Sequence, residues 1–388
     1  MKANLTETRE ANALVALQGL GQSVWLDNIS KSVLDSGQLK RLIEEDGLRG
    51  VTSNPTIFEK AINGSNDYDS VLSRLAKAGL AADEIYEALA IDDIQRAAGL
   101  FEPLFQATGG QDGFVSLEVS PALANDTQKT LEEARRLWTR VARPNVMIKV
   151  PGTPSGVPAV EQLIAEGINV NVTLMFSMQH YVAAAEAYVR GLRKRSRAGL
   201  SVAVASVASF FVSRVDSLID KQLEERLASA TSADERRRLE PLLGKTAIAN
   251  SRLVYRKFKE IFSRQDFLDL RINGARVQRP LWASTSTKNP KYRDVLYAEE
   301  LIGPDTVDTM PPATIDSFKD HGQVRPSLEE GLAEAEEVFR CLREAGIDLN
   351  AATEKLQEDG VKLFAESFET LMKSLDSKRQ SFTAQADS

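Results

Sequence analysis

The sequence predicts a single (β/α)8 TIM barrel with additional helices, and three observations lead to this fold class. Eight short apolar segments rich in β-branched residues recur along the chain, as buried strands do. Most of them are separated by sequence with helical periodicity, which implies parallel strands covered by helices. No G-x-G-x-x-G motif follows the first segment, so the alternative, an open doubly wound sheet, lacks its dinucleotide fingerprint. Eight such units in one chain favour the closed barrel.

The predicted elements alternate between strand and helix. Strands are expected at residues 23–27, 49–54, 114–119, 146–150, 168–174, 201–207, 280–284 and 305–310. Amphipathic helices are expected at residues 37–45, 82–105, 126–141, 179–194 and 212–227. The charge-rich region 212–262 indicates solvated helix faces, and 328–374 indicates two closing helices. We therefore expect one domain at 1–378, a barrel with N-terminal and C-terminal helical extensions, and a disordered tail at 379–388.

The composition excludes several classes of function. The formal charge of −7 and pI near 5.3 argue against nucleic acid or anionic membranes as partners. Cys341 is the only cysteine, so neither an intrachain disulfide nor a cysteine-based metal cluster can form. His180 and His321 are too few for a histidine-rich metal site. The first residues lack an apolar secretory core, and no apolar run could cross a bilayer. We expect a cytoplasmic protein without a metal.

The alternation inside the strands places polar residues on one face. In the fourth strand, for example, Lys149 lies opposite three valine and isoleucine residues. Because the flanking helices need the apolar face, the polar face must point into the barrel. The polar residues at or near the C-terminal strand ends are Asp27, Asn54, Glu118, Lys149 and Thr173. Barrel enzymes place their active sites at this end, so these residues are candidates for a site. The alternative is a structural polar network, to which five separate strands would have to contribute.

The residue types suggest amine chemistry on a carbonyl. An ordinary lysine, with a pKa of about 10.4, is almost wholly protonated at pH 7, whereas apolar surroundings favour the neutral, nucleophilic amine. Lys149 has apolar neighbours in the sequence. Glu118 and Asp27 can supply the general acid and base that imine formation needs.

Two segments are candidates for phosphate binding. Ser209 to Arg214 follows the sixth strand and begins a helix, and 283–288, rich in Ser and Thr, follows the seventh. Barrels often bind phosphate on such loops with backbone N–H groups and a helix start. The second segment could equally be a capping loop.

Taken together, several segments resemble the transaldolase family. The resemblance spans roughly residues 22–320 in the family's order. It is carried by Trp25-Leu26-Asp27-Asn28-Ile29, Gly50-Val51-Thr52-Ser53-Asn54-Pro55-Thr56, Ser116-Leu117-Glu118-Val119, Ile148-Lys149-Val150-Pro151-Gly152-Thr153, Ile168-Asn169-Val170-Asn171-Val172-Thr173-Leu174 and Ser209-Phe210-Phe211-Val212-Ser213-Arg214. Residues 282–304 are similar to the longer bacterial type of this family.

The resemblance implies an enzyme of the pentose phosphate pathway that needs no cofactor and takes sugar-phosphate substrates. It would transfer a dihydroxyacetone unit from sedoheptulose 7-phosphate to glyceraldehyde 3-phosphate, giving erythrose 4-phosphate and fructose 6-phosphate. By the same resemblance, Lys149 forms the Schiff base and Asp27 takes the proton that triggers carbon–carbon cleavage. Glu118 with Thr173 orients a water molecule. The implied substrate-binding residues are Asn54, Asn171 and Ser209 for hydroxyls and Arg214 and Ser284 for phosphate.

One departure from the family pattern concerns the phosphate. Many members carry Ser-x-Arg after the seventh strand, whereas this chain has Ser284-Thr285-Ser286. Lys288 is expected to supply the missing charge, as a point cation without the bidentate guanidinium geometry.

Three other functions remain as alternatives. A fructose 6-phosphate aldolase uses the same imine chemistry but is typically shorter and has tyrosine where Glu118 stands. A non-catalytic sugar-phosphate-binding barrel would form no imine. A metal-dependent aldolase is disfavoured by the scarcity of histidine.

Overall fold

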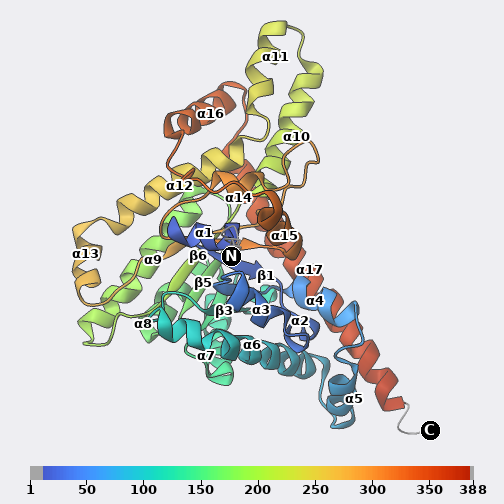
Figure 1. The fold of residues 1–388 in the computed structure, drawn as a ribbon. Coiled ribbons are helices and arrows are strands. Elements are labelled where there is room, and N and C mark those ends of the chain that lie inside the picture. Colours follow the sequence, from blue (N-terminus) through green and yellow to red (C-terminus); the bar gives the residue numbers. More distant parts are fainter. Residues whose placement is uncertain (1–11, 385–388) are drawn as a thin grey trace, which may run out of the picture.

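The predicted barrel is confirmed by the computed structural model, which describes residues 12–384. Its eight strands are parallel and pair in chain order, and β8 closes the barrel on β1. The strands are β1 (Gln22–Asp27), β2 (Gly50–Thr52), β3 (Phe114–Glu118), β4 (Val146–Pro151), β5 (Val170–Met175), β6 (Ser206–Phe211), β7 (Arg279–Ala283) and β8 (Thr306–Met310). They lie at the centre of the molecule with helices around them (Figure 1).

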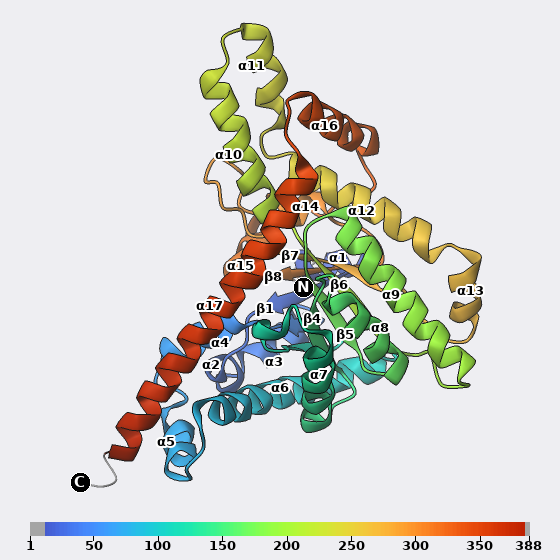
Figure 2. The ribbon, with the colours of Figure 1, turned by 180° about the vertical axis from the view of Figure 1, so that it is seen from behind.

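The helices include those that connect the strands and several that extend the barrel. They are α1 (Ala13–Gly19), α2 (Lys31–Asp35), α3 (Gln38–Glu45), α4 (Pro55–Asn63), α5 (Asp69–Lys77), α6 (Ala82–Ala107), α7 (Thr127–Val141), α8 (Gly156–Glu166), α9 (Met178–Arg197), α10 (Ser213–Ser229), α11 (Ala233–Leu239), α12 (Thr246–Phe262), α13 (Gln265–Ile272), α14 (Leu296–Glu300), α15 (Pro312–His321), α16 (Leu332–Glu344) and α17 (Leu349–Ala384). The helices α10 and α11 project beyond the barrel, with α16 nearby (Figures 1 and 2).

The sixth strand differs from its prediction. It runs from Ser206 to Phe211 rather than over residues 201–207. Valine alternates with small residues already over 201–205, but pairing begins only at Ser206, opposite Val170. The carbonyl of Val204, just before the strand, has a side-chain partner instead: it accepts a hydrogen bond from the Tyr188 hydroxyl at 2.8 Å. Periodicity alone therefore could not locate the start of this strand.

The strand register brings the predicted polar residues side by side. Lys149 on β4 is paired with Glu118 on β3 and with Asn171 on β5. Residues paired in parallel strands share a face, so all three point into the lumen. Gly50 lies against the ring of Trp25, where a Cβ atom would come within 2.6 Å of the indole. This close contact requires glycine at the start of β2.

The N-terminal end of the barrel is closed by a polar cluster. The guanidinium of Arg279 lies 3.0 Å from the Asp112 carboxylate and donates to the Ser23 hydroxyl at 2.9 Å. All three side chains are buried or nearly so. The candidate residues lie at the opposite end of the barrel.

The C-terminal helix α17 is longer than predicted. It packs against α4, α5, α6 and α10 and passes along one side of the barrel (Figure 2). Residues 379–384 belong to it, so the disordered tail predicted at 379–388 is wrong over that part, and the rest lies outside the described residues. The helix continues because it is docked: the Lys378 ammonium lies 2.9 Å from the Asp69 carboxylate of α5.

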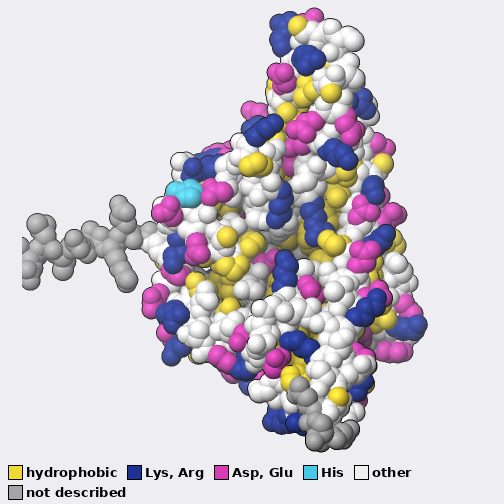
Figure 3. All heavy atoms as spheres, turned by 90° about the vertical axis from the view of Figure 1, so that its right-hand side faces the viewer, with side chains coloured by type: hydrophobic (Ala, Val, Ile, Leu, Met, Phe, Trp, Pro, Cys, Tyr) yellow, Lys and Arg dark blue, Asp and Glu magenta, His cyan; other side chains and the backbone are white. Residues whose placement is uncertain are grey.

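The outer surface carries mixed charges. On the face drawn in Figure 3, Lys and Arg side chains are interspersed with Asp and Glu rather than gathered in one patch. Within residues 12–384, every helix is too short or too polar to cross a membrane.

Candidate active site

Lys149 is the centre of the candidate site. It lies near the end of β4 with only 4% of its surface exposed. Its Nζ is 3.1 Å from Oε2 of Glu118 and donates to the carbonyl oxygen of Ser53 at 3.1 Å. The ring of Phe364, from α17, lies 5.9 Å from the same nitrogen. The amine is therefore held in a largely dry position with one carboxylate beside it.

Glu118 is the carboxylate partner of this amine. Burial raises its pKa, and the nearby Lys149 ammonium opposes that rise. Apart from the ion pair, neither carboxylate oxygen accepts a well-aligned hydrogen bond from the described residues. Such a carboxylate can accept a proton from the amine and has free lone pairs for a ligand or a water molecule.

Asp27 is the second carboxylate of the site. Burial raises its pKa, and the charge of Lys149 and a hydrogen bond from Thr52 oppose the rise. The Thr52 hydroxyl lies 2.7 Å from Oδ1 of Asp27 and 2.6 Å from the Thr309 hydroxyl. One carboxylate oxygen is thus fixed by the barrel wall while the other can face a substrate.

The polar residues of β5 and β6 form a connected group. The Ser209 hydroxyl donates to Oδ1 of Asn171 at 2.7 Å, and Nδ2 of Asn171 donates to the Ser116 hydroxyl at 3.0 Å. These bonds fix the orientation of the Asn171 amide. Thr173 is fully buried, and its hydroxyl has no protein partner within residues 12–384. Asn171 and Thr173 lie on β5, and Ser209 lies within β6, whereas the sequence predicted Ser209 after the sixth strand.

Asn54 has a structural contact that the sequence did not reveal. Its Oδ1 accepts a hydrogen bond from the backbone N–H of Ile57 at 3.0 Å and caps the N-terminus of α4. Its Nδ2 makes no hydrogen bond to the described part of the chain. The cap fixes the side chain, and the NH₂ group is left to donate to a ligand.

The predicted phosphate residues meet at the start of α10. The Ser284 hydroxyl lies 2.9 Å from the Ser213 hydroxyl, and the N–H of Ser213 donates to the Ser284 carbonyl. Ser284 adopts the left-handed conformation, with φ of 58°, which is strained for a residue with a side chain. Arg214 lies over the Phe211 ring at 5.3 Å, and burial lowers its pKa. It also lines a surface cleft of about 550 Å³ between α10 and α17.

Lys288 belongs to the same region. Burial and the neighbouring charge of Arg214 lower its pKa, whereas Asp27 raises it. Its Nζ donates to the Ser286 hydroxyl at 2.6 Å. The connection that carries Lys288 is tied to α10 by a hydrogen bond of 2.6 Å from the Tyr292 hydroxyl to Asp220. Two cations therefore stand near one another at the open end of the site.

Sequence reasoning missed the contribution of α17. Phe364 faces Lys149, and Gln357 donates to the carbonyl oxygens of Gly152 and Leu174 at 3.2 and 2.8 Å. A phenylalanine and a glutamine in a helix some 200 residues after the lysine carry no pattern that links them to a strand end. The backbone carbonyl of Ser53 also escaped prediction, since side-chain patterns do not report on it.

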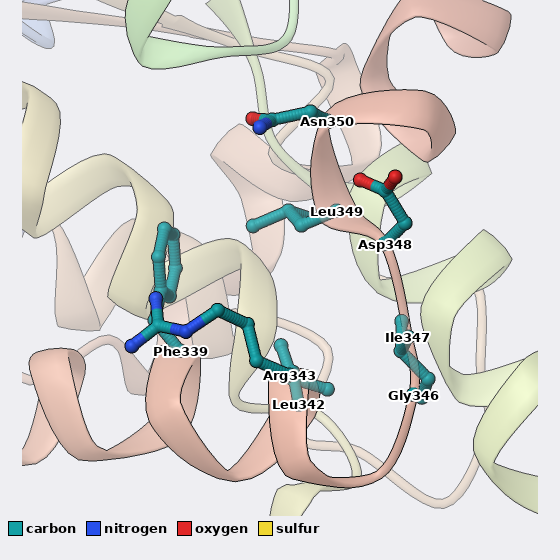
Figure 4. A pocket seen from close by; sticks show the side chains of 8 residues that line it. All are labelled: Phe339, Leu342, Arg343, Gly346, Ile347, Asp348, Leu349 and Asn350. Carbon is teal, nitrogen blue, oxygen red and sulfur yellow. The ribbon is translucent and has the colours of Figure 1, made fainter.

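Another cavity lies away from this site. A partly open pocket of about 410 Å³ lies where α16 joins α17, between residues 339 and 350 (Figure 4). None of the predicted site residues lines it. The described residues also contain no group of three His, Cys, Asp or Glu side chains that could hold a metal.

Comparison with known proteins places the chain in a family. The family model described as transaldolase/fructose-6-phosphate aldolase matches residues 24–375. A protein named transaldolase 2 from Nostoc sp. (strain PCC 7120) is 47% identical over 371 residues, 95% of this chain and 97% of its own length. Transaldolases from Trichodesmium erythraeum and Thiobacillus denitrificans are 45% and 47% identical, over 96% and 91% of this chain and 99% and 96% of their own lengths. The chain therefore belongs to the transaldolase/fructose-6-phosphate aldolase family.

Proposed function

We propose that this chain is a transaldolase that moves a dihydroxyacetone unit from sedoheptulose 7-phosphate to glyceraldehyde 3-phosphate through a Schiff base on Lys149. The observation that carries the proposal is a buried lysine amine 3.1 Å from one carboxylate, with a second carboxylate in the same lumen. Family membership over residues 24–375 supports the same reaction. We place the enzyme in the cytoplasm, because a chain with a single cysteine forms no intrachain disulfide and so needs no oxidising compartment.

The first step is imine formation. Glu118 takes a proton from the Lys149 ammonium, and the resulting neutral amine attacks the C2 carbonyl of the ketose. Burial favours this transfer, because it destabilises the separated charges of the pair and raises the pKa of Glu118. The carbinolamine then loses water as Glu118 returns its proton to the departing hydroxyl. A water molecule between Glu118 and the free hydroxyl of Thr173 would carry these protons.

Carbon–carbon cleavage follows. Asp27 takes the proton of the C4 hydroxyl, the C3–C4 bond breaks, and its electron pair moves to the iminium to form an enamine on Lys149. Thr52 holds one oxygen of Asp27 in place, so the other is directed at the substrate. The acceptor aldehyde adds in the reverse sense, Asp27 returns the proton, and hydrolysis of the new imine releases fructose 6-phosphate. The amide NH₂ of Asn54, together with Asn171 and Ser209, would hold the hydroxyls of the transferred unit.

The substrate phosphate is assigned to the open end of the site. Arg214 and Lys288 supply positive charge, and Ser284 supplies a hydroxyl beside the start of α10. Neither cation is neutralised by an ion pair with the described residues. Recognition of an anionic substrate thus depends on a local pocket although the whole chain is acidic.

Borohydride reduction in the presence of fructose 6-phosphate, followed by peptide mass spectrometry, tests the proposal. We expect a reduced dihydroxyacetone adduct on Lys149, absent in Lys149→Ala and retained in the matched variant Lys288→Ala. If the folded wild-type protein shows no adduct on any lysine, the imine mechanism is wrong and a sugar-phosphate-binding role replaces it. Unchanged activity in a strong chelator excludes the metal-dependent alternative.

The same preparation separates the two activities named by the family. A transaldolase passes the three-carbon unit to erythrose 4-phosphate, whereas a fructose 6-phosphate aldolase releases free dihydroxyacetone. We expect transfer to exceed release by at least about tenfold, because the amine is buried beneath Phe364 and the enamine is shielded from protonation.

A further inference from the structure

A second cavity reaches Glu118 from the side of the barrel. It holds about 430 Å³ and lies between α6 and α7, beside the end of β3. Its inner part is lined by Glu118, Tyr86 and Phe368. Its outer part is lined by Arg136 and Arg140, whose side chains are both 48% exposed. The cavity therefore extends from Glu118, whose carboxylate oxygens are themselves buried, toward solvent.

This cavity and the predicted phosphate-binding residue Arg214 lie on different sides of the barrel. The cleft that contains Arg214 lies between α10 and α17, beyond the end of β6. The side cavity lies beyond β3, which is separated from β6 by two strands in the barrel order. A sugar phosphate in the mouth of the barrel, with its phosphate at Arg214 and Ser284, would leave the side cavity free.

The side cavity has both polar and apolar walls. The Tyr86 ring packs edge-on against Phe58 and Phe368 at 5.8 and 5.3 Å. Tyr86 is partly buried, and its hydroxyl makes no hydrogen bond within the part of the chain that the structure describes. Its pKa is raised by burial and by the charges of three carboxylates, Glu118, Glu133 and Glu87. The hydroxyl thus lies within electrostatic reach of both the catalytic carboxylate and the outer acidic groups.

The charged groups at the outer end of the cavity are fixed by ion pairs and a hydrogen bond. Glu87 pairs with both Arg136 and Arg140. Glu133 accepts a hydrogen bond from the backbone N–H of Ser120 at 3.0 Å. These bonds tie α6, α7 and the segment after β3 together. The cavity is therefore built in part from anchored side chains, and its carboxylate, guanidinium and hydroxyl groups can form hydrogen bonds with water.

The proposed reaction needs such a route. Imine formation joins an amine to a carbonyl and releases one water molecule, and hydrolysis of the product imine consumes one. Both events take place while a sugar phosphate fills the mouth of the barrel. We propose that water reaches and leaves Glu118 through this side cavity. In this proposal Tyr86 is a positioning residue, and its hydroxyl positions the water. The inference rests on the imine chemistry proposed for Lys149.

The test compares a step that needs water with one that does not. Exchange of the C2 oxygen of fructose 6-phosphate with ¹⁸O-labelled water requires imine formation and hydrolysis. Consumption of erythrose 4-phosphate in the first turnover of enzyme preloaded with dihydroxyacetone requires only carbon–carbon bond formation. In Tyr86→Phe we expect the enzymatic exchange rate to fall about tenfold while the first-turnover rate stays within twofold of wild type. A merely structural role would slow both rates together.

Two further variants sharpen the comparison. Ser120→Leu narrows the cavity without removing a helix cap, because the Ser120 side chain makes no capping hydrogen bond. This variant should slow the ¹⁸O exchange and leave the first-turnover rate unchanged. Tyr181→Phe is the control, because its hydroxyl also lacks a hydrogen-bond partner in residues 12–384 but lies on α9 and does not line the side cavity. It should change neither rate.

Each result has a definite consequence. Exchange rates within twofold of wild type in both Tyr86→Phe and Ser120→Leu would overturn the side route. A slowed exchange in Ser120→Leu alone would keep the route and remove the role given to Tyr86. Absence of any borohydride adduct in the wild type would instead contradict the proposed function, so the two failures can be told apart.

Discussion

The Nζ of Lys149 and Oε2 of Glu118 are 3.1 Å apart in the interior of the barrel, on strands whose register pairs the two residues directly. Both side chains are almost completely buried, with 5% and 2% of their surfaces exposed. A buried ion pair is costly to desolvate and is weak evidence for stability. Its presence at the C-terminal end of a barrel is better explained by a proton that has to move between the two groups.

Glu118→Gln tests this explanation. The amide keeps the size of the side chain and one acceptor oxygen but cannot take a proton from the amine. We expect kcat to fall by about 10²- to 10⁴-fold, the usual contribution of a general acid or base. Circular dichroism should show a folded protein. Activity within threefold of wild type would mean that another group moves the proton.

Asp27→Asn separates cleavage from imine formation. Without a carboxylate to accept the C4 hydroxyl proton, the C3–C4 bond should remain intact while Lys149 still condenses with the substrate. Borohydride reduction with fructose 6-phosphate should then give a six-carbon phosphorylated adduct instead of the three-carbon adduct. If the variant yields the three-carbon adduct at the wild-type rate, Asp27 is not the base for cleavage.

Lys288→Ala tests the replacement of the family arginine. Loss of one cation beside Arg214 should raise KM for fructose 6-phosphate about tenfold and leave kcat within about threefold, because the charge binds substrate and transition state alike. Unphosphorylated fructose should be affected little. Lys291→Ala, three residues further on and exposed, is the control and should leave both constants unchanged. Equal losses with both sugars would contradict a role in phosphate binding.

The strands and their inward residues could be predicted because they depend on local alternation. Lys149, Glu118 and Asn171 share a face as soon as the period of two and the covering helices are recognised. The start of β6 could not be predicted, since the alternation begins before Ser206 and only the partner strands decide where pairing starts. Local pattern fixes which residues face inward, whereas tertiary pairing fixes where each strand begins.

The rest of the site depends on segments distant in sequence. Phe364 reaches Lys149 only because α17 docks across the barrel, held in part by Gln357 on backbone carbonyl oxygens. The cap made by Asn54 and the cavity beside Tyr86 likewise arise from packing between elements. Sequence periodicity does not indicate such contacts. The functional residues on the strands of a barrel can therefore be predicted from sequence more readily than the residues from other elements that pack around them.

Asp308 should make the free energy of unfolding depend on pH, and this effect can be measured separately from activity. It is fully buried on β8, accepts a hydrogen bond from the Thr285 hydroxyl at 2.8 Å, and leaves Oδ2 without a partner in residues 12–384. Burial raises its pKa to about 7, opposed by the Thr285 bond. An unfolded aspartate has a pKa of about 3.9. Between these values the native state holds a proton that the unfolded state has lost. This residue therefore makes the free energy of unfolding fall as pH rises from about 4 to 7. Above pH 7 the loss of stability stays constant.

Asp308→Asn should remove that loss, because the amide is neutral at every pH and its oxygen can still accept the Thr285 hydroxyl. Three pKa units correspond to at most about 4 kcal/mol, so we expect a gain of about 2–4 kcal/mol in the free energy of unfolding at pH 8, shrinking to nearly zero near pH 4. Thr285→Val should act in the opposite direction, since loss of the bond that favours the charged carboxylate raises the pKa further and deepens the loss at pH 8. Urea unfolding of the three proteins at pH 4.5, 6 and 8 measures both effects. If the free energies of unfolding of Asp308→Asn and wild type change in parallel across this range, the carboxyl is ionised in the native state at all three pH values. The buried environment of β8 must then provide a counter-charge or water that offsets its burial.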